Sequence, residues 1–319
     1  MKLNVLVLVS RQRHVQVDTL LESLGEEVNL TVLKITDEQM ADLSRVLNSV
    51  ALDRFDRTLV LLKFRYIRRQ WSILRDLPGL VIHETDACQD RIRESRLFGA
   101  FTDFYRKLPV LRLICTGYTL SHYFSTKGIA AHFIPKGADT IVLQDLGLKR
   151  DIELGFIGKM IQGVYRQRTR MIQTLHEKEG LQMFRTEGID EYRNGLNRIR
   201  IFVSADIQLG EYMYKNFEAM ACGCLLMAYR QGGGEEEALG FADLQNVVLY
   251  NNENEFMEKL SWLRANPQEV ERIRHAGKEY VHSRWGFPQI GKQIAEIVQM
   301  PVPPNAAYVQ PWWRRLRFQ

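Results

Sequence analysis

The most informative segment of the chain is Tyr214-Lys-Asn-Phe-Glu-Ala-Met-Ala-Cys-Gly-Cys-Leu-Leu-Met-Ala228. Its first part favours a helix, Gly223 ends that helix, and the apolar residues after it predict a buried strand that begins at once. A helix that runs through a glycine into a buried strand is typical of an α/β protein with a parallel sheet. Within the helix, Lys215 and Glu218 are three residues apart and therefore share one face.

Strands and helices alternate on both sides of this segment. The apolar runs predict strands at residues 3–9, 29–35, 58–63, 79–83, 110–116, 130–134, 152–157, 182–185, 200–204, 224–228 and 246–250. Helical periodicity falls at residues 15–23, 38–50, 119–127, 166–178, 213–221, 255–264, 267–284 and 288–298. The pattern predicts an α/β fold with two Rossmann-like, doubly wound domains that face each other across a cleft.

The chain has 319 residues, which fits two domains of ordinary size. Proline and glycine turn signals in Ile134-Pro-Lys-Gly-Ala-Asp139 mark the end of the first domain. We expect one domain at residues 1–139, a second at 140–299 and a tail at 300–319.

The composition is that of an ordinary globular protein, with 45% hydrophobic and 25% charged residues. The net charge of +5 is compatible with an anionic substrate, a phospholipid surface or nucleic acid, and does not choose among them. Four cysteines without CxxC spacing indicate neither a zinc site nor a disulfide framework. The short apolar N-terminus reads as a strand, and no apolar run is long enough to span a bilayer, so we expect a cytoplasmic protein.

Lys215 and Glu218 have two interpretations. A lysine near a helix N-terminus can neutralise phosphate, and a glutamate one turn later can accept the hydroxyls of a ribose. The alternative is a surface salt bridge between residues i and i+3.

The string Phe217-Glu-Ala-Met-Ala-Cys-Gly-Cys224 resembles the donor-site helix of the glycosyltransferase group 1 superfamily, which has the GT-B fold, and is closest to its spore-maturation-type branch. The resemblance extends over residues 134–285, from the segment that enters the donor domain to the closing helices. It implies that Glu218 grips the nucleotide ribose and that Lys215 lies near the ribose and phosphates. It also implies a retaining mechanism that uses no metal or other cofactor.

One position departs from the family pattern. Many members carry two glutamates with seven residues between them, but the position that matches the first is Gly210, and Glu211 lies one place later. Either the loop shifts to present Glu211 to the donor sugar, or that contact is missing.

A second part of the donor site is expected after the strand at 152–157. A strand that ends in Gly158, followed by a loop and a helix, can hold a diphosphate with backbone N–H groups and with Lys159 and Arg168. The alternative is a solvated basic helix face, because Arg166 and Arg170 are close by.

On the acceptor side, His83-Glu-Thr-Asp86 follows a predicted strand. His83 or Asp86 could assist removal of a proton from an acceptor hydroxyl. Alternatively, Asp86 only caps the next helix.

Two segments mix basic and aromatic residues, Lys63–Trp71 and the tail Trp312–Phe318. The first could contact an anionic membrane, bind nucleic acid, or be a basic helix that packs Tyr66 and Trp71 inward. For the tail we favour membrane contact, and the competing role is a return of the chain to the first domain. No nucleic-acid module is recognised, and we expect no nucleic-acid partner.

The sequence thus predicts a glycosyltransferase that moves a sugar from a nucleotide-sugar donor to a hydroxyl of a polysaccharide, a lipopolysaccharide or another glycan or lipid-linked acceptor. The alternative is a nucleotide-sugar-binding scaffold that supports a partner enzyme, which the offset of Glu211 motivates.

Overall fold

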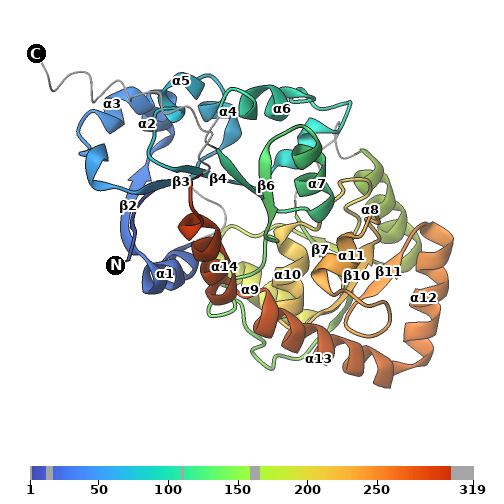
Figure 1. The fold of residues 1–319 in the computed structure, drawn as a ribbon. Coiled ribbons are helices and arrows are strands. Elements are labelled where there is room, and N and C mark those ends of the chain that lie inside the picture. The colour runs from blue at the N-terminus through green and yellow to red at the C-terminus, as the bar shows by residue number, and fades with distance from the viewer. Residues whose placement is uncertain (1, 12–16, 109–110, 159–165, 303–319) are drawn as a thin grey trace, which may run out of the picture. The chain divides into compact units, whose positions relative to one another are not determined.

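The computed structural model describes residues 2–11, 17–108, 111–158 and 166–302 (Figure 1). The chain divides into two compact units. Unit 1 holds the residues up to Thr116, Leu120–Ile134 and those from Ile290 onward, and unit 2 holds Gly117–Thr119 and Pro135–Gln289. Each unit contains its own parallel sheet, which confirms the predicted fold class of two Rossmann-like α/β domains.

The sheet of unit 1 has the strand order β2-β1-β3-β4-β5-β6, and every neighbouring pair is parallel. Its strands are β1 (Asn4–Ser10), β2 (Asn29–Ile35), β3 (Arg57–Leu61), β4 (Leu80–Glu84), β5 (Arg112–Cys115) and β6 (Ala130–Phe133). The helices are α1 (Asp18–Glu27), α2 (Asp37–Ala41), α3 (Leu43–Leu47), α4 (Phe64–Ile67), α5 (Trp71–Leu74), α6 (Ala100–Tyr105) and α7 (Tyr118–Thr126), with short 3-10 turns at Leu52–Arg54 and Ala87–Asp90.

One long helix expected in this unit is broken in two. The periodicity at residues 38–50 is present, but α2 ends at Ala41 and α3 starts at Leu43. The side chain of Asp42 accepts a hydrogen bond from the backbone N–H of Arg45 at 3.2 Å. This N-cap starts a new helix where the apolar pattern alone predicted a continuous one.

The sheet of unit 2 has the order β11-β10-β9-β7-β8 and is also entirely parallel. Its strands are β7 (Ile152–Ile157), β8 (Gln182–Phe184), β9 (Ile199–Ser204), β10 (Leu225–Tyr229) and β11 (Val248–Tyr250). The helices are α8 (Arg166–Glu179), α9 (Ile189–Arg198), α10 (Tyr214–Ala221), α11 (Glu235–Leu239), α12 (Glu253–Ala265) and α13 (Pro267–Arg284).

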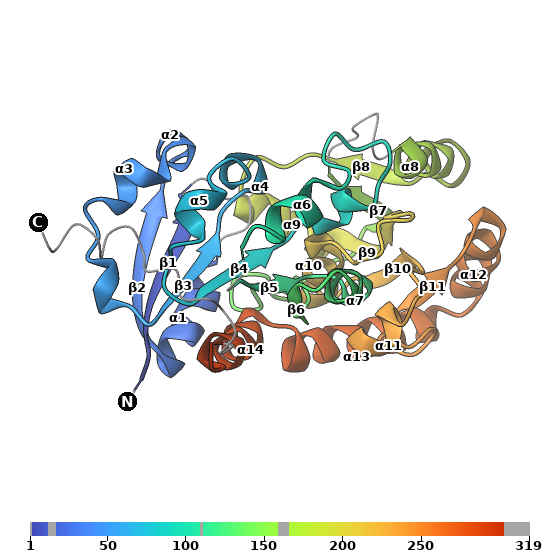
Figure 2. The same ribbon diagram turned by 45° about the horizontal axis from the view of Figure 1, so that its top comes forward.

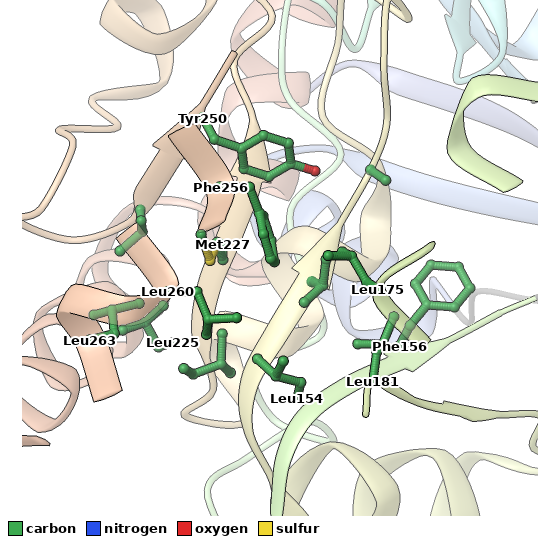
Figure 3. Packing of buried hydrophobic residues seen from close by; sticks show 14 of the residues in the cluster. Leu154, Phe156, Leu175, Leu181, Leu225, Met227, Tyr250, Phe256, Leu260 and Leu263 are labelled. Atoms are coloured by element: carbon green, nitrogen blue, oxygen red, sulfur yellow. The ribbon is translucent and has the colours of Figure 1, made fainter. Parts of the chain in front are cut away.

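Unit 2 is held together by a buried apolar cluster between its sheet and helices α8, α12 and α13 (Figure 3). Leu154 and Phe156 of β7 contribute to it, as do Leu225 and Met227 of β10. These alternate strand positions point to the same side of the sheet. Their burial fixes the register of β7 and β10, and with it the positions at which the two strands end.

The last helix, α14 (Phe287–Gln299), passes from unit 2 into unit 1. It packs against α1, because a Cβ atom added at Gly291 would lie 2.6 Å from the carbonyl oxygen of Leu20 (Figure 2). Arg57 then binds the end of the helix, donating hydrogen bonds to the carbonyl oxygens of Val298 and Met300, each at 3.1 Å.

This division differs from the sequence-based one at two places. The boundary between the units falls after Ile134 and not after residue 139, and residues from Ile290 onward join unit 1 instead of extending the second domain. The tail segment Trp312–Phe318 lies outside the described residues. Among the helices that the structure describes, none is both long and apolar enough to cross a membrane.

Candidate functional site

The candidate donor residues gather at the carboxyl ends of β7 and β9. These strands are neighbours, and β8 lies on the other side of β7, so the chain leaves β7 in one direction and later returns on the other. Such a change of direction is the topological switch point, where ligands bind in doubly wound sheets. Gly158 follows β7, Asp206 follows β9, and Lys215 lies in the first turn of α10.

Lys215 lies against the end of β7. Its ammonium group donates a hydrogen bond to the carbonyl oxygen of Ile157 at 3.0 Å and lies 4.9 Å from the ring centroid of Phe156. A Cβ atom at Gly158 would lie too close to this ammonium group, so a larger residue there would displace the Lys215 side chain. Burial lowers the pKa of Lys215, and the charge of Arg168 lowers it further, whereas Asp206 and Glu218 raise it.

Glu218 lies one turn further along α10 and is only 8% exposed. The hydroxyl of Tyr192, on α9, donates a hydrogen bond to its Oε2 atom at 2.6 Å. Burial raises the pKa of Glu218, while the Tyr192 hydrogen bond and the charge of Lys215 lower it. Within the described part of the chain, no ion pair joins Lys215 to Glu218, so the simple surface salt bridge is not what the structure shows.

Arg168, in the first turn of α8, forms an ion pair with Asp206. The side chain of Asp206 is only 4% exposed, and that of Arg168 is 12% exposed. The Oδ2 atom of Asp206 accepts hydrogen bonds from the hydroxyl of Ser204 and the amide of Asn216, both at 3.1 Å. Arg168 is therefore not part of a solvated basic face, because a fixed carboxylate holds its guanidinium group beside the switch point.

Glu211 is completely buried and forms an ion pair of 2.5 Å with Lys136, which is 2% exposed. The structure thus places the carboxylate in a buried pair that joins the entry segment of unit 2 to the loop after β9. Lys159 lies outside the described residues, so the structure says nothing about its position.

The acceptor-side candidates occupy different environments in unit 1. β4 extends one residue beyond the predicted strand, to Glu84, so His83 lies inside the strand, and its side chain is buried. Asp86 is exposed and precedes a 3-10 turn, and its backbone N–H donates to Glu84 at 2.9 Å. Glu84 is buried, also accepts a hydrogen bond from Tyr105 at 3.1 Å, and has its pKa raised to about 8, chiefly by burial.

The basic segment after β3 forms two short helices in the structure. Phe64 and Ile67 point into the core, whereas Tyr66 and Trp71 are only half-buried. Partial burial of Tyr66 and Trp71 does not decide among the three alternatives for this segment.

The described residues contain no group of three or more His, Cys, Asp or Glu side chains that could hold a metal ion. All four cysteines are buried and unpaired with one another. Burial raises the pKa of the Cys224 thiol to about 12, so this sulfur is an unreactive thiol at neutral pH.

Sequence reasoning missed Asp206, Asn216 and Tyr192. No local motif marks them, because each acts through a contact with a residue far along the chain. Tyr192 was missed with its helix, since Gly195 and two asparagines weaken the helical signal of α9. A Cβ atom at Gly195 would lie 3.1 Å from the Ile157 side chain, so close packing on β7 explains that glycine.

Comparison with known proteins supports a relation to glycosyl transferases. The family model described as glycosyl transferase-like matches residues 166–296. This range runs from the start of α8 into α14 and contains Arg168, Asp206, Lys215 and Glu218. No curated protein matches the sequence.

Solved structures resemble the chain over nearly its whole length. Sucrose-phosphate synthase from Thermosynechococcus elongatus has a TM-score of 0.68 at 11% identity, covering 93% of this chain and 98% of its own. Anabaena Alr3699/HepE in complex with UDP and glucose has a TM-score of 0.67 at 14% identity, covering 94% and 100%. An alpha-glucosyltransferase in complex with UDP and a 13-mer DNA has a TM-score of 0.62 at 10% identity, covering 94% and 100%.

Identities this low establish a common fold and nothing finer. The family match nevertheless points to the same kind of protein as the strand order of the two sheets and the similar solved structures do. Residues 166–296 match the family model described as glycosyl transferase-like, and the chain as a whole has the GT-B fold of the solved structures that it resembles.

Proposed function

We propose that this protein is a glycosyltransferase that moves a sugar from a nucleotide-sugar donor to a hydroxyl of a glycan or lipid-linked acceptor. The observation that carries the proposal is the arrangement of Lys215, Arg168 and Glu218 at the switch point of unit 2. Two cations and a buried carboxylate at this edge of the sheet match the two ends of a nucleoside diphosphate. In this proposal unit 2 binds the donor and unit 1 the acceptor.

Each side chain has a role that its chemistry allows. Lys215 and Arg168 neutralise the diphosphate and stabilise the charge that develops on it as the glycosidic bond breaks. The backbone at Gly158 approaches the phosphates, together with Lys159. Glu218 accepts hydrogen bonds from the ribose hydroxyls, since Tyr192 occupies only its Oε2 atom.

The contact of Glu211 with the donor sugar remains part of the proposal, although the carboxylate is paired with Lys136. The resemblance of residues 217–224 to the spore-maturation-type branch further suggests a retaining, metal-independent transfer. In that mechanism, a donor phosphate oxygen takes the proton from the acceptor hydroxyl.

The similar solved structures support a nucleotide-sugar donor. Anabaena Alr3699/HepE is described in complex with UDP and glucose, and the alpha-glucosyltransferase in complex with UDP. Since the fold places its ligand at the same edge of the sheet, a nucleoside diphosphate is the first ligand to test here.

On the acceptor side we propose Asp86 as the carboxylate that contacts the acceptor hydroxyl. It is exposed and follows the end of β4, whereas His83 is buried within that strand and would act only after a rearrangement.

We take the arginine-rich segments after β3 and β4 of unit 1 together as one candidate basic surface. Phe64 stacks on Phe101 with ring centroids 3.7 Å apart, which holds α4 against α6. Trp71 lies beside two cations, with Arg75 at 5.4 Å and Lys107 at 5.9 Å from its ring. The exposed cations of this surface include Arg65, Arg68, Arg69, Arg91, Arg93 and Arg96. An anionic membrane that carries a lipid-linked acceptor, such as a precursor of a cell-surface polysaccharide, fits this charge and the half-exposed tryptophan.

The proposal is tested by a thermal-shift screen of UDP, GDP, ADP, CMP and dTDP and their sugars, with Glu218→Ala beside the wild type. We expect one nucleotide to raise the midpoint of the wild type and not that of the variant. A folded wild type that responds to no nucleotide contradicts the donor site.

The scaffold alternative is separated from the enzyme by turnover. With the nucleotide identified, we expect slow hydrolysis of its sugar conjugate by the wild type and none by Glu218→Ala. Binding without any release of sugar, with or without candidate acceptors, favours the scaffold.

A further inference from the structure

Asp206 lies at the centre of the basic part of the site. Its Oδ1 atom pairs with Arg168, from α8, and its charge acts on Lys215, from α10. Its Oδ2 atom accepts a hydrogen bond from Asn216, the residue next to Lys215, and another from Ser204, at the end of β9. One carboxylate thus links the two elements that carry the cations.

The need for this carboxylate follows from charge and burial. Arg168 is 12% exposed, and Lys215 is partly buried against Phe156 and Ile157. Two cations in such a place repel each other, and each loses part of its hydration, so the pair is unfavourable without an opposite charge. Asp206 supplies that charge and cannot swing away, because two hydrogen bonds and its burial hold it in place.

We infer that Asp206 is the fixed counter-ion of the diphosphate subsite, a positioning residue that orients Arg168 and keeps Lys215 charged until the donor arrives. The inference rests on the proposed function, because it presumes that these cations receive a diphosphate. It assigns Asp206 no contact with the reacting atoms.

The charge on Lys215 is the property to measure. Its charged neighbours among the described residues are Asp206 on the loop after β9, Arg168 on α8 and Glu218 on α10. Burial and Arg168 lower the pKa of Lys215, and Asp206 raises it. Binding of an anion must therefore weaken as the pH rises through the pKa of Lys215, and it must weaken at a lower pH when Asp206 is neutral.

The test is Asp206→Asn, assayed by titration calorimetry with inorganic diphosphate and with the nucleoside diphosphate that the screen identifies. This change removes the charge and keeps the shape. The buried Oδ1 atom of Asn216, which accepts no hydrogen bond within the described residues, can accept one from the new amide after a flip of the Asn216 side chain.

At about pH 6.5 we expect Asp206→Asn to bind diphosphate with nearly the affinity of the wild type. As the pH rises, its affinity should begin to fall about one pH unit below the point at which the affinity of the wild type falls. Above both pKa values, the variant then binds about tenfold more weakly than the wild type. Asp151→Asn is the matched control, because it removes a carboxylate from an exposed pair with Arg198 at the other end of β7. This control must follow the wild type at every pH.

Arg168→Gln provides an independent test that does not depend on the folding of Asp206→Asn. Arg168→Gln removes one of the two cations that face Asp206, so the affinity for diphosphate falls overall. Because Arg168 lowers the pKa of Lys215, the pH at which affinity falls should move upward in this variant. A profile that stays in place, or moves to lower pH, overturns the inference.

The remaining outcomes separate the inference from the proposed function. An Asp206→Asn profile identical to that of the wild type overturns the inference and leaves the donor site standing. Inorganic diphosphate bound in an Asp206-dependent way, with no nucleotide bound, supports the inference and overturns the proposed function. A wild type that binds neither ligand overturns both.

Discussion

The hydrogen bond from Tyr192 to Glu218 leads to a prediction with a distinctive pH dependence. Tyr192→Phe removes the hydroxyl that donates to Glu218 at 2.6 Å. A hydrogen bond to a charged group contributes about 1.5–3 kcal/mol. The carboxylate of Glu218 is buried, which raises its pKa, and Tyr192 opposes that effect. Without the hydroxyl the pKa rises further, and a larger fraction of Glu218 is protonated at neutral pH.

A protonated Glu218 accepts ribose hydrogen bonds less well than a carboxylate does. We therefore expect the nucleoside diphosphate to bind Tyr192→Phe on the order of tenfold more weakly near pH 7, which corresponds to about 1.4 kcal/mol. The defect must shrink as the pH rises, because Glu218 ionises in both proteins once the pH exceeds both pKa values.

The assay is titration calorimetry at several pH values between about 6 and 9, on both sides of neutrality. Tyr280→Phe is the matched control, since it removes a tyrosine hydroxyl that donates to the carbonyl oxygen of Leu239 at 2.9 Å, away from the switch point. Equal affinity of Tyr192→Phe and the wild type would refute the role of the hydrogen bond. A loss of the same size at every pH would show that Tyr192 acts through packing and not through the charge of Glu218.

Three further predictions concern stability and chemistry. Arg57→Ala removes hydrogen bonds at the end of α14, so we expect urea denaturation to show that the free energy of unfolding falls by about 1–3 kcal/mol. Arg57→Lys should lose less stability than Arg57→Ala. An unchanged midpoint would contradict the anchoring of α14 in unit 1. Glu84 has its pKa raised from 4.5 to about 8, so it is protonated more readily in the folded state and stability must fall as the pH rises across that interval. Urea denaturation near both limits should show a smaller fall for Glu84→Gln, and equal falls would argue against a buried, protonated Glu84. Transfer to an acceptor should proceed unchanged in the presence of EDTA, and a loss that Mn²⁺ restores would reject the metal-independent mechanism.

The central strands of the sheets could be predicted from the sequence because they are buried on both faces. The segment Ile152–Ile157 is apolar apart from Glu153, which predicts a strand in an α/β chain, and the structure has the strand with those bounds. The helix Pro267–Arg284 was equally well marked, since proline occupies its first turn. The parts predicted less well are those decided by single side chains, such as Asp42, whose cap divides a periodic segment into two helices.

The return of α14 to unit 1 shows a different limit. Its amphipathic pattern predicts a helix, but the pattern does not state which sheet the apolar face covers. That choice depends on Gly291, which permits close packing on α1, and on Arg57, which binds the far end of the helix. Leu20 of α1 and Arg57 both lie more than two hundred residues before their partners in α14, so no local pattern connects them to that helix.

The candidate site divides along the same line. Lys215 and Glu218 could be proposed because both belong to a helix whose sequence resembles a known donor-site helix, whereas their spacing alone left a surface salt bridge open. The contacts of Asp206 and Tyr192 with the site become apparent only in the folded chain, where β9 lies beside β7 and α9 packs against β7. A ligand for a diphosphate needs cations, which can be read from a motif, but partly buried cations also need a fixed opposite charge. Asp206 supplies that charge because the strand order brings the end of β9 beside the end of β7, and no spacing in the sequence indicates this.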